Sequence, residues 1–559
     1  MSHSRWNILP PIPDSYLDTA VFPRLVSQIL YNRGLTDVSQ LDSFIAADQG
    51  LSADPSLLPG MHQAVARIFQ ALLSGEKIAV YGDFDTDGIT ATALMVHGLS
   101  ILQGNVTAYI PHRQSEGYGL NITALENLRQ QGASLVITVD CGISSLSEVK
   151  RAKRKGLDIV ITDHHTPPEI VPPADAIVDP RLPDSHYPFS ELAGVGVAFK
   201  LLQALFQGIG QEEKLNGLTD LVALGTVADM MPLLGENRYL VKEGLKILNS
   251  SPRPGLREII AQSGINSTNI NAQTISWNIA PRLNAAGRME HAMGGYRLLM
   301  TESPLEAKEL AAWLEQKNAE RQRLTTKALA KAKEQVSTQA DRAMLIASDD
   351  DYPIGIIGLV AGRLCDEFYR PAIAIRTGKE TSTGSCRSIP EFNIIQALTR
   401  CKNLFTHFGG HSQAAGFSLL TRNLPQLQEA LLNMASTQLE GFDLRPKLDI
   451  DAEVMLAELG GNTFPTMQKL APFGQGNPEP VFLSRRVEVV DYRTMGNNGE
   501  HLRLKLKQHG NVWDGVGFRL SHYLPETPPP LDIAYNLELD SWGGEERLRL
   551  NILDFVPSG

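Results

Sequence analysis

The feature of this chain that most constrains its fold is a pattern repeated between residues 77 and 180. A short run rich in Val and Ile is followed by an acidic residue and then by a helical stretch, as in KIAVYGDFDTDG before ITATALMVHGLSIL, and SLVITVDCG before LSEVKRAKRKG. Near-continuous apolar strands that alternate with helices are typical of a parallel sheet covered on both faces. We therefore predict an α/β domain over residues 76–300, with functional groups at the carboxyl ends of its strands.

The rest of the chain divides by changes of pattern. Residues 304–337 lack glycine and internal proline and predict one long helix that bridges two domains, within a connecting segment over 301–340. A second α/β domain is predicted over 341–444. From residue 445 to 559, short alternating strands with Gly, Asn and Pro turns predict an all-β domain, a small barrel. Residues 1–75 form an N-terminal segment to which we assign no role.

Composition limits the class of protein. At 559 residues the chain is too long for one hydrophobic core, and 43% hydrophobic with 20% charged residues is typical of packed globular domains. Because no apolar run approaches the length of a membrane span and no signal peptide is recognisable, we expect a soluble, cytoplasmic protein without membrane attachment. The four cysteines form no CxxC pair, which argues against a cysteine zinc site or a disulfide framework. With a net charge of −11, any nucleic-acid binding must be local, although carboxylates that hold divalent cations present positive charge to a phosphate.

The densest chemical signal is a set of three carboxylates at alternate positions, Asp83, Asp85 and Asp87. An EF-hand loop would need a Glu at its twelfth position, which here is Leu94. A phosphate-binding P-loop is excluded because no GK[ST] follows. Carboxylates crowded after a strand repel one another unless cations neutralise them, so a metal site is the simplest interpretation, with solvated turn aspartates as the alternative. The glycines at 194–196 lack the full dinucleotide fingerprint and predict packing at a helix start.

A second signal is Asp163-His164-His165, again directly after an apolar strand. Imidazole suits borderline metals such as Mn²⁺, and adjacent histidines on an extended strand cannot both face one pocket, so we expect one ligand and one phosphate-facing group. Asp140 and Asp229 are weak signals alone, because a lone aspartate at a strand end is more often a cap. Together, the acidic and imidazole groups suit a pair of divalent ions that could activate a water for hydrolysis of a phosphoester or phosphoanhydride.

At the level of motifs, DFDTDG, VDCG, TDHH and GGHSQAAG (409–416) resemble the motif set of the DHH phosphoesterase superfamily with its DHHA1 domain. The segments NAAGRM (284–289), SCRS (385–388) and PFGQGNPEPVF (472–482) extend the resemblance over nearly the whole chain, to the RecJ family of bacterial single-strand-specific exonucleases. The resemblance implies a DHH catalytic domain, a DHHA1 substrate-binding domain and a C-terminal OB-fold. It also implies a 5′-to-3′ exonuclease that degrades single-stranded DNA to mononucleotides in DNA recombination and repair.

The same resemblance assigns residues to roles. It implies two ions, Mn²⁺ or Mg²⁺, held by Asp83, Asp85, Asp87, Asp140, His164 and Asp229. Asp140 would bridge the ions, and the catalytic residues would be His165, Asp140 and Asp163. Many relatives have a His where this chain has Tyr81, so whether Asp83 or Asp85 completes the shell of one ion stays open.

Residues in the second half of the chain are predicted to bind the substrate. Glycines 409 and 410 free backbone amides to approach an anion, His411 adds a donor, and Arg387 with Ser385 can cradle a phosphate. The resemblance places Arg113, Ser385 and Arg387 near a terminal 5′-phosphate. It places Arg282, Asn284 and Arg288 along the entering strand.

The β domain carries a strand with alternating basic and apolar side chains. His501, Arg503, Lys505 and Lys507 share one face and three leucines share the other, and Arg547 with Arg549 repeats the device. We predict a groove that binds a DNA backbone, with a merely solvated sheet face as the alternative. The aromatic residues that either stack on bases or pack in the core are Trp513, Phe518 and Tyr535.

We expect a monomer that acts on single-stranded DNA, and the resemblance implies a single-strand-binding protein and a helicase as partners. Three other functions share parts of the pattern: a phosphodiesterase for very short RNA or dinucleotides, a family II inorganic pyrophosphatase, and an inactive DHH scaffold in a replication complex. The extra β domain argues against the first and the chain length against the second. The intact acidic set argues against the third, because clustered charges are costly to keep without a purpose.

Overall fold

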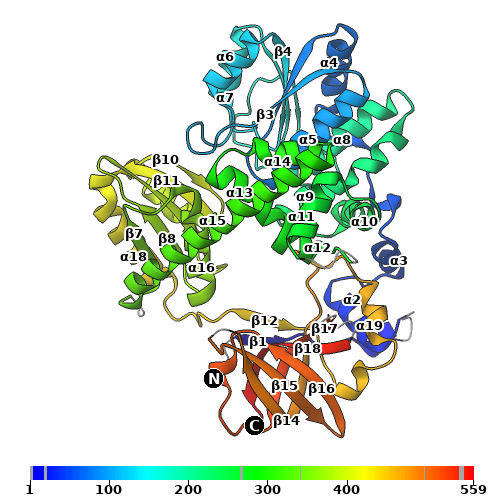
Figure 1. The fold of residues 1–559 in the computed structure, drawn as a ribbon, viewed down its shortest axis with the longest axis vertical. Helices are drawn as coiled ribbons and strands as arrows, with labels where there is room; N and C mark the ends of the chain where they lie inside the picture. The colour runs from blue at the N-terminus through cyan, green and yellow to red at the C-terminus, as the bar shows by residue number, and fades with distance from the viewer. Residues whose placement is uncertain (1–3, 18–21, 265–268, 340–341, 497, 541–546) are drawn as a thin grey trace. The chain divides into compact units, whose positions relative to one another are not determined.

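Figure 1 shows the computed structural model of the chain, which describes residues 4–17, 22–264, 269–339, 342–496, 498–540 and 547–559. The described residues form two compact units, one of residues 52–444 and one that joins the residues up to 51 with 445–559. The predicted N-terminal segment is therefore divided between the two units. The predicted boundary at residues 340 and 341 lies outside the described residues. No helix in the described ranges is long and apolar enough to cross a membrane.

The first half of the 52–444 unit is built on a five-stranded, wholly parallel sheet in the order β3-β2-β4-β5-β6. Its strands are β2 (Lys77–Tyr81), β3 (Asn105–Tyr109), β4 (Ala133–Val139), β5 (Asp158–Thr162) and β6 (Ala176–Val178). The chain passes from β2 outward to β3 and then crosses back to β4, so the strand order reverses between β2 and β4. Open α/β sheets bind ligands at such a point, outside the carboxyl ends of the strands. The predicted α/β fold is confirmed.

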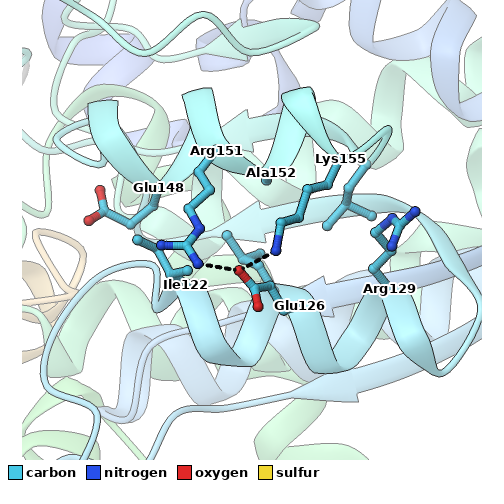
Figure 2. Close-up of a pocket in the computed structure, with 9 residues that line it drawn as sticks. Ile122, Glu126, Arg129, Glu148, Arg151, Ala152 and Lys155 are labelled. Atoms are coloured by element: carbon cyan, nitrogen blue, oxygen red, sulfur yellow. Dashed lines mark ion pairs between the residues drawn. The ribbon is translucent and has the colours of Figure 1, made fainter.

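Different helices cover the two faces of this sheet (Figure 1). Ile78 and Val80 belong to the larger apolar core, which includes three helices: α4 (Met61–Leu73), α5 (Thr86–Ile101) and α8 (Gly194–Gln207). Ala79 and Tyr81 belong to a separate core on the opposite face, beneath α6 (Ile122–Gln130) and α7 (Leu146–Arg154). Between α6 and α7, Glu126 lies 2.9 Å from the Arg151 guanidinium and 2.7 Å from Lys155 Nζ, as Figure 2 shows.

A helical layer follows the sheet along the chain. Its elements are η3 (Glu212–Leu218), α9 (Thr219–Ala228), α10 (Gly235–Ser250), α11 (Pro254–Gln262), α12 (Ala272–Thr274), the π-helical turn η4 (Ile275–Ile279), α13 (Ala280–Met289) and α14 (Met293–Met300), while η2 (Pro55–Leu57) precedes α4. Helices α9 and α14 pack against α5, so this layer extends the core over the helix that begins after β2.

The long helix α15 (Pro304–Ser337) begins and ends where the sequence predicts. Ser303 accepts a hydrogen bond from the Glu306 amide, and Pro304 occupies the first helical position, both of which favour a helix start. Ala311 and Leu314 lie in the core of the first α/β domain, whereas Ala328 and Ala332 lie in the core of the second. The helix therefore bridges the two domains, as predicted.

The second α/β domain has a five-stranded sheet in the order β10-β11-β9-β8-β7, parallel only between β7 and β8. Its strands are β7 (Leu345–Asp349), β8 (Ala372–Arg376), β9 (Thr381–Arg387), β10 (Phe405–Gly410) and β11 (Ala414–Leu420). Its helices are η5 (Ile354–Ile356), α16 (Ile357–Phe368), α17 (Ile394–Arg400), η6 (Lys402–Leu404), η7 (Thr421–Asn423) and α18 (Leu424–Gln438). Helix α16 packs against β8 and β9 (Figure 1).

The other unit contains the predicted barrel. Strand β14 (Phe482–Met495) pairs with both β15 (His501–Gln508) and β17 (Leu531–Asp540), and β16 (Asn511–Gly517) with β18 (Arg547–Pro557) completes the closed sheet. The remaining elements are β1 (Arg5–Ile8), α1 (Asp14–Leu17), α2 (Arg24–Asn32), α3 (Val38–Ala46), η1 (Gln49–Leu51), β12 (Lys447–Ile450), β13 (Ala452–Glu453), η8 (Leu456–Leu459), α19 (Thr463–Gln468) and η9 (Ser521–Tyr523). Because β1 pairs in parallel with β12, the start of the chain folds with its C-terminal part.

A buried ion pair fixes the first residues of the 52–444 unit. Lys200 Nζ lies 2.8 Å from Glu236 Oε1, and both side chains are fully buried. The same ammonium group donates hydrogen bonds to the Ala53 carbonyl oxygen at 2.6 Å and to Ser52 Oγ at 3.2 Å. The Tyr187 hydroxyl donates to the other oxygen of Glu236. The charges are thus paired and hydrogen-bonded, as buried charges must be.

Replacing Lys200 by Met should lower the free energy of unfolding of this unit by about 3–5 kcal/mol, because the Glu236 charge would stay buried without its partner. The measurement is urea unfolding followed by circular dichroism. Lys246→Met is the control, because it breaks an ion pair with Glu243 in which the lysine is 62% exposed, and it should cost less than about 1 kcal/mol. Equal losses in the two variants would contradict this account of the pair.

Candidate metal centre and phosphate pocket

The first acidic motif forms the turn between β2 and α5. Asp85 is the N-cap of α5 and accepts a hydrogen bond from the Gly88 amide at 3.0 Å, so its side chain closes the turn. A Cβ at Gly88 would lie 2.5 Å from the Asp83 carbonyl oxygen, which explains the glycine in DFDTDG. Asp83 and Asp87 are 4% and 2% exposed, so the turn buries two carboxylates beside one another.

The start of α8 holds Asp87 in place. The backbone amides of Gly194 and Val195 donate hydrogen bonds of 2.7 and 2.9 Å to the two oxygens of Asp87, where the unpaired amides and the dipole of a helix N-terminus favour a negative charge. A Cβ at Gly194 would lie 2.5 Å from Cβ of Asp140, so the helix approaches this close only because the residue is glycine. The predicted packing at a helix start is confirmed.

Asp140 directly follows β4 and adopts a left-handed backbone conformation with φ of 60°. Few residue types other than glycine, asparagine and aspartate tolerate this conformation. The side chain is 3% exposed and lies 3.2 Å, Oδ1 to Nε2, from His164, which comes from the segment after the neighbouring strand β5. The carboxyl ends of β2, β4 and β5 therefore deliver their polar side chains to one place, as the sequence predicts.

Asp163 orients the two histidines that follow it. One carboxylate oxygen accepts hydrogen bonds from the backbone amides of His164 (2.8 Å) and His165 (3.2 Å) and from Nδ1 of His165 (2.7 Å), and the other accepts from the Ile143 amide (2.9 Å). The side chain is completely buried. With its oxygens engaged in this way, Asp163 positions its neighbours, and it does not belong to the groups of facing ligand atoms described below.

The rings of the two histidines lie next to each other. Their ring centroids are 4.5 Å apart, and both rings offer a nitrogen near Asp140. Because β5 ends at Thr162, the histidines are not on the extended strand that the sequence argument assumed, and the division into one ligand and one phosphate-facing group stays a prediction. His165 keeps 44% of its side chain exposed. Burial lowers its pKa, but the hydrogen bond and charge of Asp163 outweigh burial and raise the pKa to about 9, so the ring is an imidazolium at neutral pH.

His164 is buried and neutral. Burial and the adjacent charge of His165 lower its pKa to about 3. Its Nε2 atom faces oxygens of Asp140, Asp229 and Asp87 at 3.2, 3.6 and 4.0 Å, yet neither ring nitrogen has a hydrogen-bond partner among the described residues. A buried imidazole that faces three carboxylates and has no hydrogen-bond partner among the described residues fits a metal ligand.

The ligand atoms fall into three overlapping groups, each within 4.8 Å: Asp83, Asp85 and Asp140; Asp87, His164 and Asp229; and Asp140, His164 and His165. Burial and mutual repulsion raise the pKa of Asp83 and Asp140 well above the ordinary value, that of Asp87 to about 7 and that of Asp229 to about 8. Such a cluster is stable as carboxylates only if cations neutralise it. Oxygen ligands with one or two imidazoles fit Mg²⁺ or Mn²⁺, so the residues present fit the predicted metal set.

Two tyrosines lie near this centre, one buried and one exposed. Tyr81 is fully buried on the opposite face of the sheet, where its hydroxyl donates to the Gly119 carbonyl oxygen at 3.1 Å, so it is not among the groups of ligand atoms. Tyr118, which our sequence reasoning missed, is 54% exposed, and its hydroxyl lies 3.2 Å from Nδ1 of His165. The flanking glycines 117 and 119, both with positive φ, were the sequence signal for a turn that displays this ring.

A second site is a pocket of about 190 Å³ between the two α/β domains. Its lining residues are Arg113, Gln114, Arg288, Ile354, Gly355, Ile357, Gly358, Ser385 and Arg387. The Arg387 guanidinium donates to Ser385 Oγ at 3.3 Å and to the Cys386 carbonyl oxygen at 2.8 Å. Burial and the neighbouring guanidinium groups lower the pKa of Arg288 to about 9. Three arginines that line one pocket make it suited to a phosphate.

Arg113 connects the pocket to the acidic turn. Its guanidinium carbon lies 4.6 Å from the ring centroid of Phe84, the residue between Asp83 and Asp85. The structure therefore brings together Arg113, Ser385 and Arg387 as expected. It adds Arg288 to the same pocket rather than to a separate stretch of the strand path.

The other predicted substrate-binding residues lie elsewhere. Gly409, Gly410 and His411 are outside the pocket lining, in the hairpin between β10 and β11, where Gly410 has φ of 141° and a Cβ there would lie 2.3 Å from the Ala414 carbonyl oxygen. The backbone conformation and the close contact in this hairpin thus explain why residue 410 is glycine. His411 is near enough to Arg387 and His165 for both to lower its pKa, after burial, which is the largest cause.

On helix α13, two more predicted residues already have protein partners. Arg282 forms an ion pair with Glu315 at 2.5 Å and donates to the Asn278 carbonyl oxygen. Asn284 Oδ1 accepts a hydrogen bond of 2.9 Å from the Thr86 amide, in the acidic turn. Both residues brace the helix against neighbouring elements.

The predicted alternation along β15 is present in the barrel. Leu502, Leu504 and Leu506 are buried, and the basic side chains occupy the other face. Acidic residues interrupt that face: Lys505 lies opposite Asp491 and Asp514, and Lys507 Nζ is 4.0 Å from Glu488. Arg503 lies opposite Arg493 instead. The basic stripe is therefore strongest around Arg503.

Two other features of the barrel bear on the predicted DNA-binding face. Arg549 pairs with Glu538 and Asp540 at 3.2 and 2.7 Å, so β18 does not repeat the basic stripe at this position. Tyr535 is fully buried, and its hydroxyl is 2.8 Å from Ser484 Oγ, which excludes it as a surface for bases. Phe518 is 53% exposed, so of these two aromatic residues it alone keeps an accessible ring.

Comparison with known proteins gives consistent matches over the whole chain. The DHH family, N-terminal domain, matches residues 77–226, the DHHA1 domain matches 341–437 and the RecJ OB domain matches 450–554. The single-stranded-DNA-specific exonuclease RecJ of Bacillus subtilis is 38% identical over 100% of this chain and 71% of its own length. That of Dickeya dadantii is 33% identical over 98% and 97%. The crystal structure of RecJ in complex with Mn²⁺ from Thermus thermophilus superposes with a TM-score of 0.84 at 29% identity, over 99% of this chain and 80% of that one.

Replacing Asp229 by Asn should stabilise the metal-free protein. The folded-state pKa of about 8 lies above the ordinary value of 3.8, so burial of the charge and repulsion by neighbouring aspartates destabilise the native state increasingly as the pH rises from about 4 to 8. Because one unit of pKa shift corresponds to about 1.4 kcal/mol, the gain at pH 8 should exceed about 1 kcal/mol and vanish near pH 4. Thermal unfolding in chelator measures it.

Adding Mn²⁺ or Mg²⁺ should then stabilise the parent more than the Asp229→Asn variant, because an ion that binds only the native state raises its stability. Asp184→Asn, at an exposed aspartate of the same domain, is the control and should alter neither measurement. Identical unfolding of Asp229→Asn and the parent at pH 8, with and without metal, would refute the assignment of Asp229 to the centre.

Proposed function

Because the chain belongs to the RecJ family of single-stranded-DNA-specific exonucleases, we propose that it is a divalent-metal-dependent exonuclease that removes mononucleotides from the 5′ end of single-stranded DNA. The observation that carries this proposal is the arginine pocket beside the acidic turn. A pocket for a terminal phosphate next to a hydrolytic centre supports cleavage that begins from an end.

The acidic cluster is the proposed binding site for two divalent ions, Mn²⁺ or Mg²⁺. Asp140 is the proposed bridging ligand, because it alone belongs both to the group with Asp83 and Asp85 and to the group with His164 and His165. When bound, the ions supply Lewis-acid stabilisation of phosphoryl oxygens and a nucleophilic water at neutral pH. Crystal structures of RecJ from Thermus thermophilus in complex with Mn²⁺ and with Mg²⁺ support this assignment.

The protein groups around the centre have separate proposed tasks. Arg113, Arg288 and Arg387 bind the terminal 5′-phosphate through charge-assisted hydrogen bonds. His165, an exposed imidazolium held by Asp163, donates a hydrogen bond to the scissile phosphate. Burial of the acidic turn limits the access of bulk water and strengthens the electrostatic interactions at the reacting bond.

The barrel is the proposed platform for the rest of the strand, with Arg503, Lys505 and Lys507 at its basic stripe. The cytoplasm is the proposed location. A monomeric state, a role in DNA recombination and repair, and partnership with a single-strand-binding protein and a helicase are proposals that rest on the family alone.

The proposed activity is tested with 5′-phosphorylated strands labelled at the 3′ end, as single- and double-stranded DNA and RNA, with Mn²⁺ or Mg²⁺. We expect the labelled single-stranded DNA to shorten stepwise from its 5′ end and the duplex to resist. Asp140→Asn should depress turnover by several orders of magnitude while the fold persists, because asparagine tolerates the left-handed backbone at this position. Hydrolysis by the variant within about tenfold of the parent would rule out the two-ion centre.

Recognition of the terminal phosphate is tested by Arg387→Ala. Losing hydrogen bonds to a charged group costs about 1.5–3 kcal/mol, so kcat/KM for a 5′-phosphorylated strand should fall about 10- to 150-fold. A strand with a 5′-hydroxyl should be cut at an unchanged rate. Arg376→Ala, at an exposed arginine at the end of the neighbouring strand β8, is the control. An equal loss on both substrates would show that Arg387 does not read the terminal phosphate.

A further inference from the structure

Trp277 is an unusually exposed tryptophan. It retains 69% of its accessible surface, although burying an aromatic side chain removes about 150–250 Å² from water and usually dominates the energetics of a core or an interface. Its neighbours in sequence, Ser276 and Asn278, are exposed and half-buried. The indole therefore forgoes a large hydrophobic gain, and nothing in the predicted metal set or phosphate pocket explains why.

The backbone displays this side chain at a particular place. Trp277 lies in the π-helical turn η4, which runs directly into α13, and turns of this rare kind often occur at functional sites. Ile275, Ile279 and Leu283 are completely buried and turn one face of this helical segment into the core. Trp277 lies on the opposite face.

The same helical segment contacts the acidic turn. The carbonyl oxygen of Ala280, three residues after Trp277, accepts a hydrogen bond of 3.3 Å from Thr86 Oγ1, and Asn284 Oδ1 accepts one of 2.9 Å from the Thr86 amide. Asn284 and Arg288 lie on α13, which continues directly from the turn that carries Trp277, seven and eleven residues further along the chain. One continuous helical segment thus carries the exposed indole, a contact to the acidic turn and an arginine of the pocket.

We propose that the ring of Trp277 is a stacking platform for a base of the DNA strand whose terminal phosphate lies in the arginine pocket. The inference rests on the proposed function and adds a base-binding site to it. Single-strand-binding surfaces combine cations that follow the backbone with aromatic rings on which bases stack, and every base has a face that suits such a ring. A protein partner fits less well, because a stable protein interface buries about 1,200–2,000 Å² and one indole among polar neighbours offers far less.

The experiment uses 5′-phosphorylated oligodeoxynucleotides, each with one fluorescent 2-aminopurine at a successive position from the 5′ end, bound in the Asp140→Asn background so that the strand stays intact. Stacking on the indole should quench the fluorescence at one or two adjacent positions. Trp277→Ala should abolish this quenching and weaken binding about 5- to 150-fold, the range for the loss of one stacked base. Trp277→Phe should restore most of both signals, because it keeps an aromatic face.

Two controls separate this site from the rest of the molecule. Phe442→Ala removes a 53% exposed aromatic ring from the same unit and should change neither quenching nor affinity. Because Trp277 is exposed, its replacement should leave thermal unfolding unchanged, so a binding defect cannot come from misfolding.

The outcomes distinguish this inference from the proposed function. If the parent cuts single strands from the 5′ end but Trp277→Ala binds and quenches as the Asp140→Asn background does at every position, the stacking platform is wrong and the exonuclease stands. If the parent neither binds nor cuts 5′-phosphorylated strands, the proposed function is overturned, and the stacking platform with it.

Discussion

Asp83, Asp87 and Asp140 are each less than 5% exposed, and burial together with the charges of neighbouring aspartates, Asp85 among them, raises the pKa of all three. Apolar side chains do not offset this repulsion, so the backbone around the carboxylates must keep them in place. The sheet does so by ending β2 and β4, which are neighbours, at the point where the strand order reverses. Repulsion that destabilises the metal-free protein is then the source of its affinity for cations, because the same charges that repel one another attract a divalent ion.

Backbone amides, rather than lysine or arginine side chains, are the donors that orient these acids. Asp87 receives two amides from the start of α8, and Asp163 receives amides from both histidines and from Ile143. An amide orients a carboxylate without cancelling its charge, whereas an ion pair would compete with a metal. Glycine is needed at position 194 because only a residue without a Cβ lets the start of α8 approach Asp140 and Asp87 together.

The sequence was sufficient to predict what depends on local pattern. Alternating apolar strands and helices, an acid after β2, β4, β5 and β6, and the glycine-free stretch of α15 indicated the parallel sheet, the convergence of its strand ends and the bridging helix. It was insufficient where distant segments decide the outcome. The pairing of β1 with β12 has no local signal, the ion pairs of Arg549 depend on the register of β17 against β18, and the hydroxyl of Tyr535 is satisfied by Ser484. The π-helical turn that contains Trp277 was not predictable either, because the spacing of apolar residues in this segment also fits an ordinary α-helix.

Helix α15 connects the two α/β domains. At about 1.5 Å per residue its 34 residues span roughly 50 Å, and it packs against α13 at one end and α16 at the other. The phosphate pocket takes Arg288 from α13, Gly358 from α16 and Arg387 from β9, so its shape depends on how both domains lie on this helix. The ion pair between Arg282 and Glu315 ties the first domain to α15, and that between Lys331 and Asp349 ties the second. The proposed reaction requires a constant distance between a phosphate in this pocket and the reacting bond at the acidic cluster, and a continuous helix clamped to both domains is a rigid way to set that distance.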